Sequence, residues 1–264
     1  MRTKMLAGNW KMNNGGAATK DFITNLENWF SKDPVGKKSA AAVSSKAIEV
    51  VVAPPFTSIE SACSAKQTDI IQIAAQNVYH KPKGAFTGEV SLPMLEEAGC
   101  KYAIIGHSER RHVFGESNED LEKKLIATLE SRVLPIFCVG ELLEERESGN
   151  MKKVLDTQLE SAWRSLTSDV VADMVVIAYE PVWAIGTGQT ASDDDAEDAC
   201  DYIRTLAYEK FGVTSSDSLR ILYGGSVKPE NSASLLAQRD IDGLLIGGAS
   251  LDADSFEKII ASAL

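Results

Sequence analysis

A glutamate, a histidine and a lysine each follow closely on a short apolar run, where a polar side chain stands at the edge of a hydrophobic core. Glu180 comes directly after Val175–Tyr179, and His107 comes directly after Ala103–Gly106. We expect desolvation to raise the proton affinity of Glu180 and to suit it to general base catalysis. Lys11 follows an apolar run near the N-terminus, so the three groups could share one site. Taken singly, each could also be a structural strand-end residue.

Two glycine motifs follow the last two apolar runs of the chain. Gly224-Gly225-Ser226 and Gly247-Gly248 each precede a helical segment. Because glycine has no side chain, the backbone N–H groups at the start of such a helix are accessible and suited to binding phosphate. Two such turns on adjacent final strands favour a phosphate site over a pair of ordinary glycine turns.

A third glycine motif, Gly186 to Ala191, matches the dinucleotide pattern G-x-G-x-x-A. That fingerprint should open immediately after a strand, but six residues separate it here from Tyr179. The next expected strand also ends in glycines, where an acidic residue should bind the ribose. A nicotinamide-dependent oxidoreductase therefore remains only a secondary hypothesis.

Eight apolar runs rich in Val, Ile and Ala recur along the chain without polar alternation, which is typical of strands buried on both faces of a parallel sheet. Helical segments lie between them, so the pattern predicts an α/β fold, a single-domain (β/α)8 barrel over residues 1–264. An open doubly wound sheet is the alternative. In a barrel, the polar residues named above would meet at the carboxyl ends of the strands. The expected strands are Met5–Ala7, Ile48–Ala53, Ile70–Ala75, Tyr102–Ile105, Val133–Val139, Met174–Tyr179, Arg220–Tyr223 and Leu244–Ile246.

Several helix starts can be located from capping residues, and eight helical regions are expected in all. Ser117 and Ser192 each stand three residues before an aspartate, as in a capping box, and Pro229 suits a first helical position. The stretch from Ser31 to Lys46, rich in Lys, Ser and Ala, is interpreted as a surface loop.

Composition excludes several classes of partner. The chain has 27 Lys and Arg against 38 Asp and Glu, a formal net charge of −11, and no basic stripe for nucleic acid. Four well-separated cysteines predict a reducing compartment and no structural zinc. No apolar stretch suits a signal peptide or a membrane span. We expect a cytoplasmic protein, with an organelle left open if a targeting segment is removed from a longer precursor.

With these residues assembled, the sequence resembles the triosephosphate isomerase family almost from end to end. The shared motifs occur in the family's order, and together they are highly specific. They are Gly8–Asn13, Ala53–Phe56, Ala75–Val78, Gly84–Glu89, Gly106–Arg111, Ala178–Gly188, Tyr223–Val227 and Gly247–Ser250.

The resemblance implies interconversion of dihydroxyacetone phosphate and D-glyceraldehyde 3-phosphate through an enediolate, without metal or organic cofactor. It implies that Glu180 carries the proton and that His107 polarises the substrate oxygens as a neutral imidazole. Lys11, assisted by Asn9, would stabilise negative charge and bind the anionic substrate, and Glu109 matches a family carboxylate beside the site. The backbone N–H groups of Gly186, Ser226, Gly247 and Gly248 would hold the phosphate.

The resemblance also implies a homodimer and a mobile lid. The segment Gly84–Glu89 matches a loop that inserts Thr87 into a second subunit near Lys11, and residues 181–191 match the lid. Gln189 replaces a lysine common at the lid's second hinge, which bears on lid kinetics only. A phosphosugar-binding protein without catalysis is a further alternative, but it should have lost Glu180, His107 or Lys11.

Overall fold

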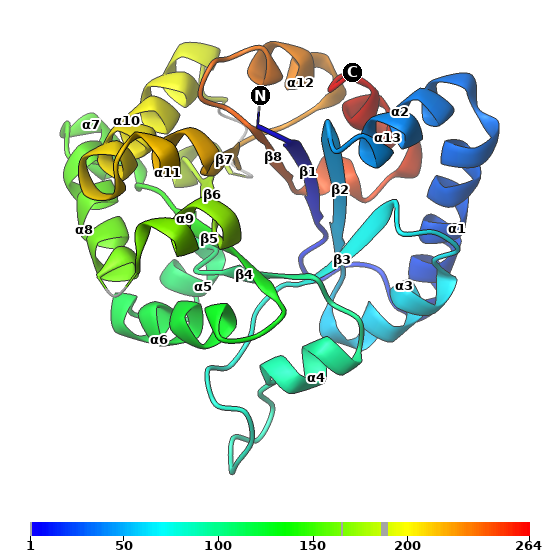
Figure 1. Ribbon diagram of the computed structural model, residues 1–264, viewed down its shortest axis with the longest axis horizontal. Coiled ribbons are helices and arrows are strands. Elements are labelled where there is room, and N and C mark those ends of the chain that lie inside the picture. Colours follow the sequence, from blue (N-terminus) through cyan, green and yellow to red (C-terminus); the bar gives the residue numbers. More distant parts are fainter. Residues whose placement is uncertain (1, 165, 186–189) are drawn as a thin grey trace.

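The strands of the chain close into a parallel barrel. Each strand pairs with its neighbours in sequence order, and β8 pairs with β1. The computed structural model describes residues 2–164, 166–185 and 190–264, with the strands at the centre and the helices around them (Figure 1). The strands are β1 (Lys4–Asn9), β2 (Ile48–Ala53), β3 (Ile71–Ala75), β4 (Tyr102–Ile105), β5 (Leu134–Val139), β6 (Val176–Tyr179), β7 (Arg220–Tyr223) and β8 (Gly243–Ile246).

Helices of very different lengths connect these strands, and three short 3₁₀ turns follow strands β2, β6 and β8. The α-helices of the described residues are α1 (Gly16–Lys32), α2 (Pro34–Ser44), α3 (Ile59–Ala65), α4 (Leu92–Glu97), α5 (Ser108–His112), α6 (Asn118–Leu129), α7 (Leu143–Glu147), α8 (Met151–Trp163), α9 (Ser168–Met174), α10 (Asp193–Phe211), α11 (Val213–Ser218), α12 (Pro229–Leu236) and α13 (Ala253–Ala261). The 3₁₀ turns are η1 (Phe56–Ser58), η2 (Val182–Ala184) and η3 (Gly248–Ser250). None of the helices in this described part is long and apolar enough to cross a membrane.

The alternation of side chains along the strands divides the core into two layers. Met5 and Ala7 of β1 point into the barrel, whereas Leu6 belongs to the larger layer between the barrel and its helices. Both layers are apolar because each strand is covered on both faces. The predicted (β/α)8 TIM barrel is confirmed, and the open doubly wound alternative is wrong because β8 returns to β1.

Closure between β8 and β1 depends on a glycine. Gly243 opens β8 with φ +154°, and a Cβ atom at this position would lie 2.1 Å from the carbonyl oxygen of Met5. A side chain would therefore push the two strands apart.

The interpretation of Ser31 to Lys46 as a loop is wrong. Helix α1 runs on to Lys32, and α2 covers most of the remainder. The Asp33 carboxylate accepts hydrogen bonds from the N–H groups of Val35 (2.8 Å) and Gly36 (3.1 Å), with Pro34 in the first turn. An N-cap aspartate followed by proline, and then by alanine and lysine, is a strong helix signal that outweighs the polar composition.

The other helix starts agree with their capping residues. Ser117 caps α6, Ser192 caps α10 in a full capping box, and Pro229 opens α12. The expected eight helical regions are subdivided in the structure, because several connections contain two helices. One of the added helices, α9, extends to Met174, so β6 begins at Val176 and not at Met174.

Candidate active site

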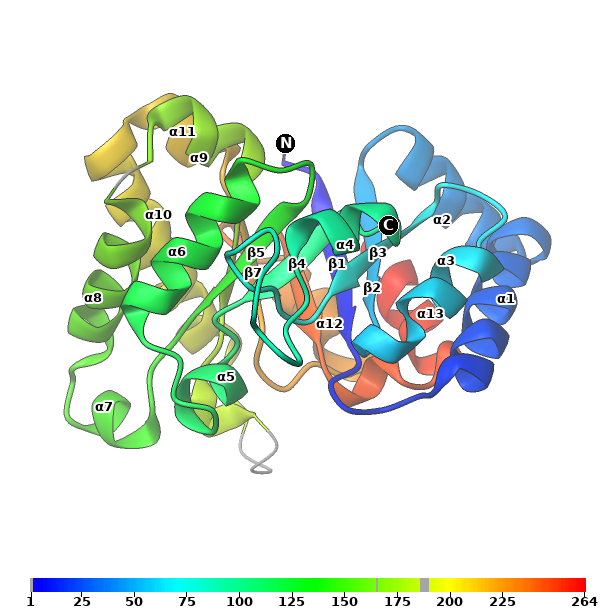
Figure 2. The same cartoon turned by 90° about the horizontal axis from the view of Figure 1, so that it is seen from below.

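Most of the predicted site residues line one cavity at the carboxyl ends of the strands. It has a volume of about 340 Å³. Figure 2 shows this end of the barrel on the same side as α5 and α7, opposite α9 and α11. Glu109 lies beside the cavity, where its carboxylate pairs with the ammonium group of Lys11. Gly186 lies outside the described residues. The predicted residues in the lining are Asn9, Lys11, His107, Glu180, Ser226, Gly247 and Gly248.

Glu180 stands directly after β6 and is almost completely buried, with 2% of its surface exposed. Its Oε1 lies 3.0 Å from Nε2 of His107, and its Oε2 accepts a 2.9 Å hydrogen bond from the backbone N–H of Ser108. Gly140 permits this position, because a Cβ atom there would lie 1.7 Å from the Glu180 carbonyl oxygen. Strands β4, β5 and β6 therefore fix the carboxylate jointly.

The pKa of Glu180 moves in the direction opposite to our expectation. Burial is the largest influence and raises the pKa, as the sequence suggested. His107, the Ser108 N–H and Lys11 favour the charged carboxylate and lower the pKa below its ordinary value of 4.5. The expectation of a raised proton affinity is therefore wrong for the free protein, because a strand-end carboxylate here has partners that sequence alone does not supply.

His107 presents one nitrogen to Glu180 and the other to the protein backbone. Its Nδ1 accepts a 3.2 Å hydrogen bond from the N–H of Glu109, so Nδ1 carries no proton in this geometry and Nε2 is the donor. Burial lowers the pKa of His107, but Glu180 outweighs burial and raises it. The raised pKa of His107 is therefore due mainly to its pairing with Glu180.

Lys11 is held in place by its own backbone as well as by its ammonium group. It has φ +52°, a conformation that is unfavourable for a residue with a side chain. Its N–H donates to Oδ1 of Asn9 (3.1 Å), and its carbonyl oxygen accepts from Nε2 of Gln76 (2.8 Å). The Nζ atom lies 2.7 Å from Oε1 of Glu109. Backbone strain maintained by several bonds is typical of a functional residue.

The glycine turns complete the cavity on the side of β7 and β8. A Cβ atom at Gly248 would meet nothing within 4 Å, and one at Gly247 would come within 3.7 Å of the Lys11 side chain. The backbone at these positions is therefore open beside the Lys11 side chain, and Ser226 lies in the same cavity, three residues before α12. This arrangement is suited to a phosphate group.

Comparison with known proteins decides the family. Residues 4–263 match the family model described as triosephosphate isomerase. The chain belongs to the triosephosphate isomerase family. It is 48% identical over 260 residues to the triosephosphate isomerase of Moorella thermoacetica and 44% identical to that of Finegoldia magna, with 98% of each chain covered. It is 43% identical over 259 residues to that of Aquifex aeolicus, covering 98% of this chain and 99% of the relative.

The protein is accordingly an isomerase that interconverts dihydroxyacetone phosphate and D-glyceraldehyde 3-phosphate in glycolysis and gluconeogenesis. This activity replaces both alternatives that the sequence left open, a dinucleotide-dependent oxidoreductase and a binding protein without catalysis. Within the described residues there is no group of His, Cys, Asp and Glu side chains that could hold a metal ion.

Two residues that support this cavity are not singled out by the sequence patterns above. Gln76 follows β3 and bridges the carbonyl oxygens of Lys11 and Ala53, the latter at 2.7 Å. Arg111 donates from Nε to the Gly106 oxygen and from Nη2 to the Cys138 oxygen, both at 2.8 Å. Arg111 thus ties the ends of β4 and β5 together beneath His107. The place of Gln76 at a strand end is a signal that could have found it.

A third supporting residue, Glu141, anchors the first residues of the segment that matches the family's lid. Its side chain is fully buried, and its Oε1 accepts from Nε1 of Trp183 (2.9 Å) and from the hydroxyl of Tyr179 (3.0 Å). Arg146 lies 3.8 Å from the same oxygen and also pairs with Asp195 at the start of α10. Burial raises the pKa of Glu141, against the lowering effect of these donors. The predicted hinge residue Gln189 lies outside the described residues.

Proposed function

We propose that Glu180, His107 and Lys11 carry the chemistry of the isomerase, with Asn9 and Glu109 in support. The observation that carries this proposal is their convergence: Glu180 and His107 are 3.0 Å apart in the cavity that also contains Lys11. Glu180 takes a proton from the carbon beside the substrate carbonyl, which forms the enediolate, and returns it to the neighbouring carbon. No atom is gained or lost in the exchange, so no cofactor is needed.

In this proposal the substrate must separate Glu180 from His107. Glu180 is a carboxylate in the free protein, so it is already in the form that a base requires. Once its carboxylate turns to the substrate carbon, His107 loses the neighbour that raises its pKa most, and the Glu109 N–H still occupies Nδ1. His107 is then a neutral imidazole that donates its Nε2–H to a substrate oxygen, and Lys11 balances the developing negative charge.

The phosphate group of the substrate would lie against the backbone N–H groups of Ser226, Gly247 and Gly248. These residues border the same cavity as the base. They follow β7 and β8, which lie across the barrel from β4, the strand that His107 follows. Gly186 is proposed as a fourth N–H donor from the lid segment on the strength of the family motif alone. Asn9 would assist Lys11, whose backbone it already holds.

A single substitution tests the electrostatic part of this proposal. In His107→Gln, Glu180 stays buried but loses the partner that most lowers its pKa, so we expect this pKa to be higher in the variant than in the wild type. The substrate phosphate itself ionises near pH 6. The titration is therefore to be followed in the free protein, by carbon NMR of the glutamate carboxyl groups. A Glu180 signal whose pKa is no higher in the variant than in the wild type would contradict the assigned pairing.

We also propose that the isomerase works as a homodimer through the Thr87 loop. The segment that contains Thr87 projects from the body of the barrel beyond α4 (Figure 1), and Thr87 itself is exposed. Large apolar side chains are exposed on this loop and on two others: Phe86 (39%), Met12 (95%) and Phe114 (66%). Apolar exposure of this extent is typical of a surface that is covered by a partner.

Thr87→Arg is expected to give monomers of much reduced activity, because an arginine would be buried in the interface without a counter-charge. Analytical sedimentation measures the association, and an assay at the same concentration measures the activity. Thr157→Arg, at an exposed position of α8, makes the same chemical change away from the loop and should remain wild type in both. An active wild-type monomer at assay concentration would remove the dimer proposal.

We further propose that residues 1–264 act as one domain and that the protein works in the cytoplasm. The pairing of β1 with β8 joins the two ends of the sequence in one barrel, so neither half has a complete sheet alone. All four cysteines have free thiols, and three of them are buried, as suits a reducing compartment. Size-exclusion and fractionation experiments on the native protein would test the two statements.

A further inference from the structure

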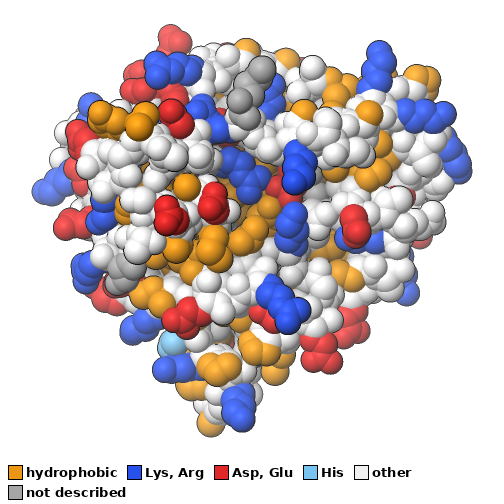
Figure 3. All heavy atoms as spheres, viewed as in Figure 1, with side chains coloured by type: hydrophobic (Ala, Val, Ile, Leu, Met, Phe, Trp, Pro, Cys, Tyr) orange, Lys and Arg blue, Asp and Glu red, His pale blue; other side chains and the backbone are white. Residues whose placement is uncertain are grey.

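A larger hollow lies at the opposite end of the barrel, around the amino ends of the strands. It has a volume of about 1280 Å³, and Figure 3 views this face, with Lys and Arg side chains bordering the depression at its centre. The isomerase reaction uses no residue of this hollow. Its lining contains six Lys and Arg residues and five Asp and Glu residues, whereas acidic residues outnumber basic ones by 38 to 27 in the whole chain.

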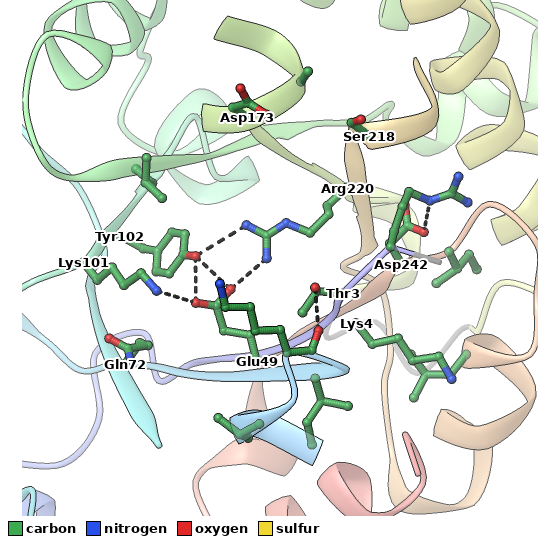
Figure 4. A pocket seen from close by; sticks show the side chains of 18 of the residues that line it. Thr3, Lys4, Glu49, Gln72, Lys101, Tyr102, Asp173, Ser218, Arg220 and Asp242 are labelled. Carbon is green, nitrogen blue, oxygen red and sulfur yellow. Dashed lines mark hydrogen bonds and ion pairs between the residues drawn. The ribbon is translucent and has the colours of Figure 1, made fainter. Parts of the chain in front are cut away.

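The floor of the hollow is a charge cluster with more cations than anions. Glu49 is its one carboxylate: Oε1 lies 2.8 Å from Nζ of Lys101, and Oε2 lies 2.7 Å from Nη1 of Arg220. The hydroxyl of Tyr102 donates to the same carboxylate at 2.8 Å, and Figure 4 shows these groups converging. Burial raises the pKa of Glu49, but the two cations outweigh burial and lower it, so Glu49 stays charged. One negative charge thus faces two positive charges, that of the largely buried Arg220 and that of the exposed Lys101.

The spare hydrogen-bonding capacity of this floor belongs to its cations. An ammonium group has three N–H donors and a guanidinium group has five, more than one carboxylate and one hydroxyl can occupy. Asp242, a further acid of the lining, is engaged by Arg2 and Arg204. Asp173 stands across the hollow from Lys101 and Glu49 in Figure 4, so it does not neutralise the cluster directly.

Lys46 adds a third cation to the same hollow, in a strained position. It follows α2 with φ +61°, in the left-handed conformation that usually selects glycine at the end of a helix. The N–H of Ala47 reaches back to the Ala42 oxygen (2.9 Å), and Thr3 Oγ1 donates to the Lys46 oxygen (2.7 Å), which fixes this conformation. Within the described residues the Lys46 ammonium makes no ion pair within 4 Å. A lysine held where glycine fits better indicates a use for its side chain.

We propose that this hollow binds a small oxyanion with two or more negative charges, a phosphate monoester or a dicarboxylate, against Lys46, Lys101 and Arg220. Lys46, Lys101 and Arg220 line the hollow together with Glu49, and these four residues leave two positive charges, which a dianion would neutralise. The volume exceeds that of a single phosphate group, so the anion can be part of a larger metabolite. The site lies at the end of the barrel opposite Glu180, and binding there need not displace the triose phosphate.

The test must separate this hollow from the active site, which also binds phosphate. Backbone amide NMR does so, because residues 46–49 and 101–102 report on the hollow and residues 247–248 report on the active site. We expect inorganic phosphate to shift the hollow signals in a saturable way, and the same titration with succinate tells whether carboxylates share the site. Saturable binding of either anion supports the proposal. The anion that binds more tightly shows whether the hollow prefers a phosphate or a dicarboxylate.

Two substitutions of Lys46 make the test specific. Lys46→Met should weaken anion binding in the hollow at least about tenfold, because a cation close to a dianion is removed. It should leave the active-site signals, kcat and KM unchanged. Lys46→Gly should lose the same affinity and also raise the Tm of the anion-free protein by about 2 °C, since the left-handed strain is relieved.

Lys153→Met serves as the control, because it removes one exposed lysine charge from α8, away from the hollow. It should bind phosphate as the wild type does. The proposal is overturned if neither anion shifts the hollow signals at concentrations up to about 10 mM. It is overturned equally if Lys46→Met binds as tightly as the wild type, or if Lys153→Met loses as much affinity as Lys46→Met.

Discussion

Glu180→Asp is expected to lower kcat about 10²-fold or more while the barrel stays folded. The shorter side chain withdraws the carboxylate by roughly 1 Å, and proton abstraction needs close contact between base and carbon. The two bonds that position Glu180, to His107 at 3.0 Å and to the Ser108 N–H at 2.9 Å, would also lengthen or break. Steady-state kinetics in both reaction directions measures the loss.

The charge of the site is unchanged in this variant, so the loss of rate reports on geometry. Circular dichroism and thermal unfolding serve as the check that the fold survives, and Glu60→Asp on the first turn of α3 serves as a matched substitution away from the site. If Glu180→Asp stayed within two-fold of the wild-type kcat, Glu180 would not be the base.

The central residues of the site could be predicted because the fold brings them together by a general rule. Glu180, His107 and Lys11 all follow buried strands, and the carboxyl ends of parallel strands meet at one end of a barrel. No long-range contact has to be known for that inference. The same rule predicts the glycine turns after β7 and β8.

The supporting residues could not be predicted in the same way, because their partners are far away in the sequence. Arg111 connects β4 to the Cys138 carbonyl oxygen, and Glu141 receives Trp183 from beyond β6. The direction of the Glu180 pKa was missed for the same reason: burial can be read from the apolar run, whereas the His107 contact cannot. Helix α2 is a different case, since its Asp33-Pro34 start signal is present in the sequence and outweighs the polar composition of the segment.

Lys11→Ala is expected to lower kcat by about 10² to 10³ and to raise KM as well. One ammonium group serves both a dianionic substrate and a transition state with developing charge, so binding and rate should fall together. The variant also leaves Glu109 without its 2.7 Å partner, which adds a repelling carboxylate beside the substrate. Lys20→Ala, an exposed lysine of α1, removes the same charge and should have wild-type kinetics.

The effect of Lys11 should be local, and ionic strength tests this. With a formal net charge of −11 the protein repels an anionic substrate at long range, so attraction must come from Lys11 and the glycine turns at short range. Charges beyond roughly 10 Å are screened at 0.1 M salt, whereas a contact inside the cavity is screened much less. The wild-type kcat/KM should therefore not rise steeply as salt is lowered, and the ratio between wild type and Lys11→Ala should change little. A steep rise in the wild type that Lys11→Ala abolishes would mean that Lys11 steers the substrate from a distance, and the local account would then be wrong.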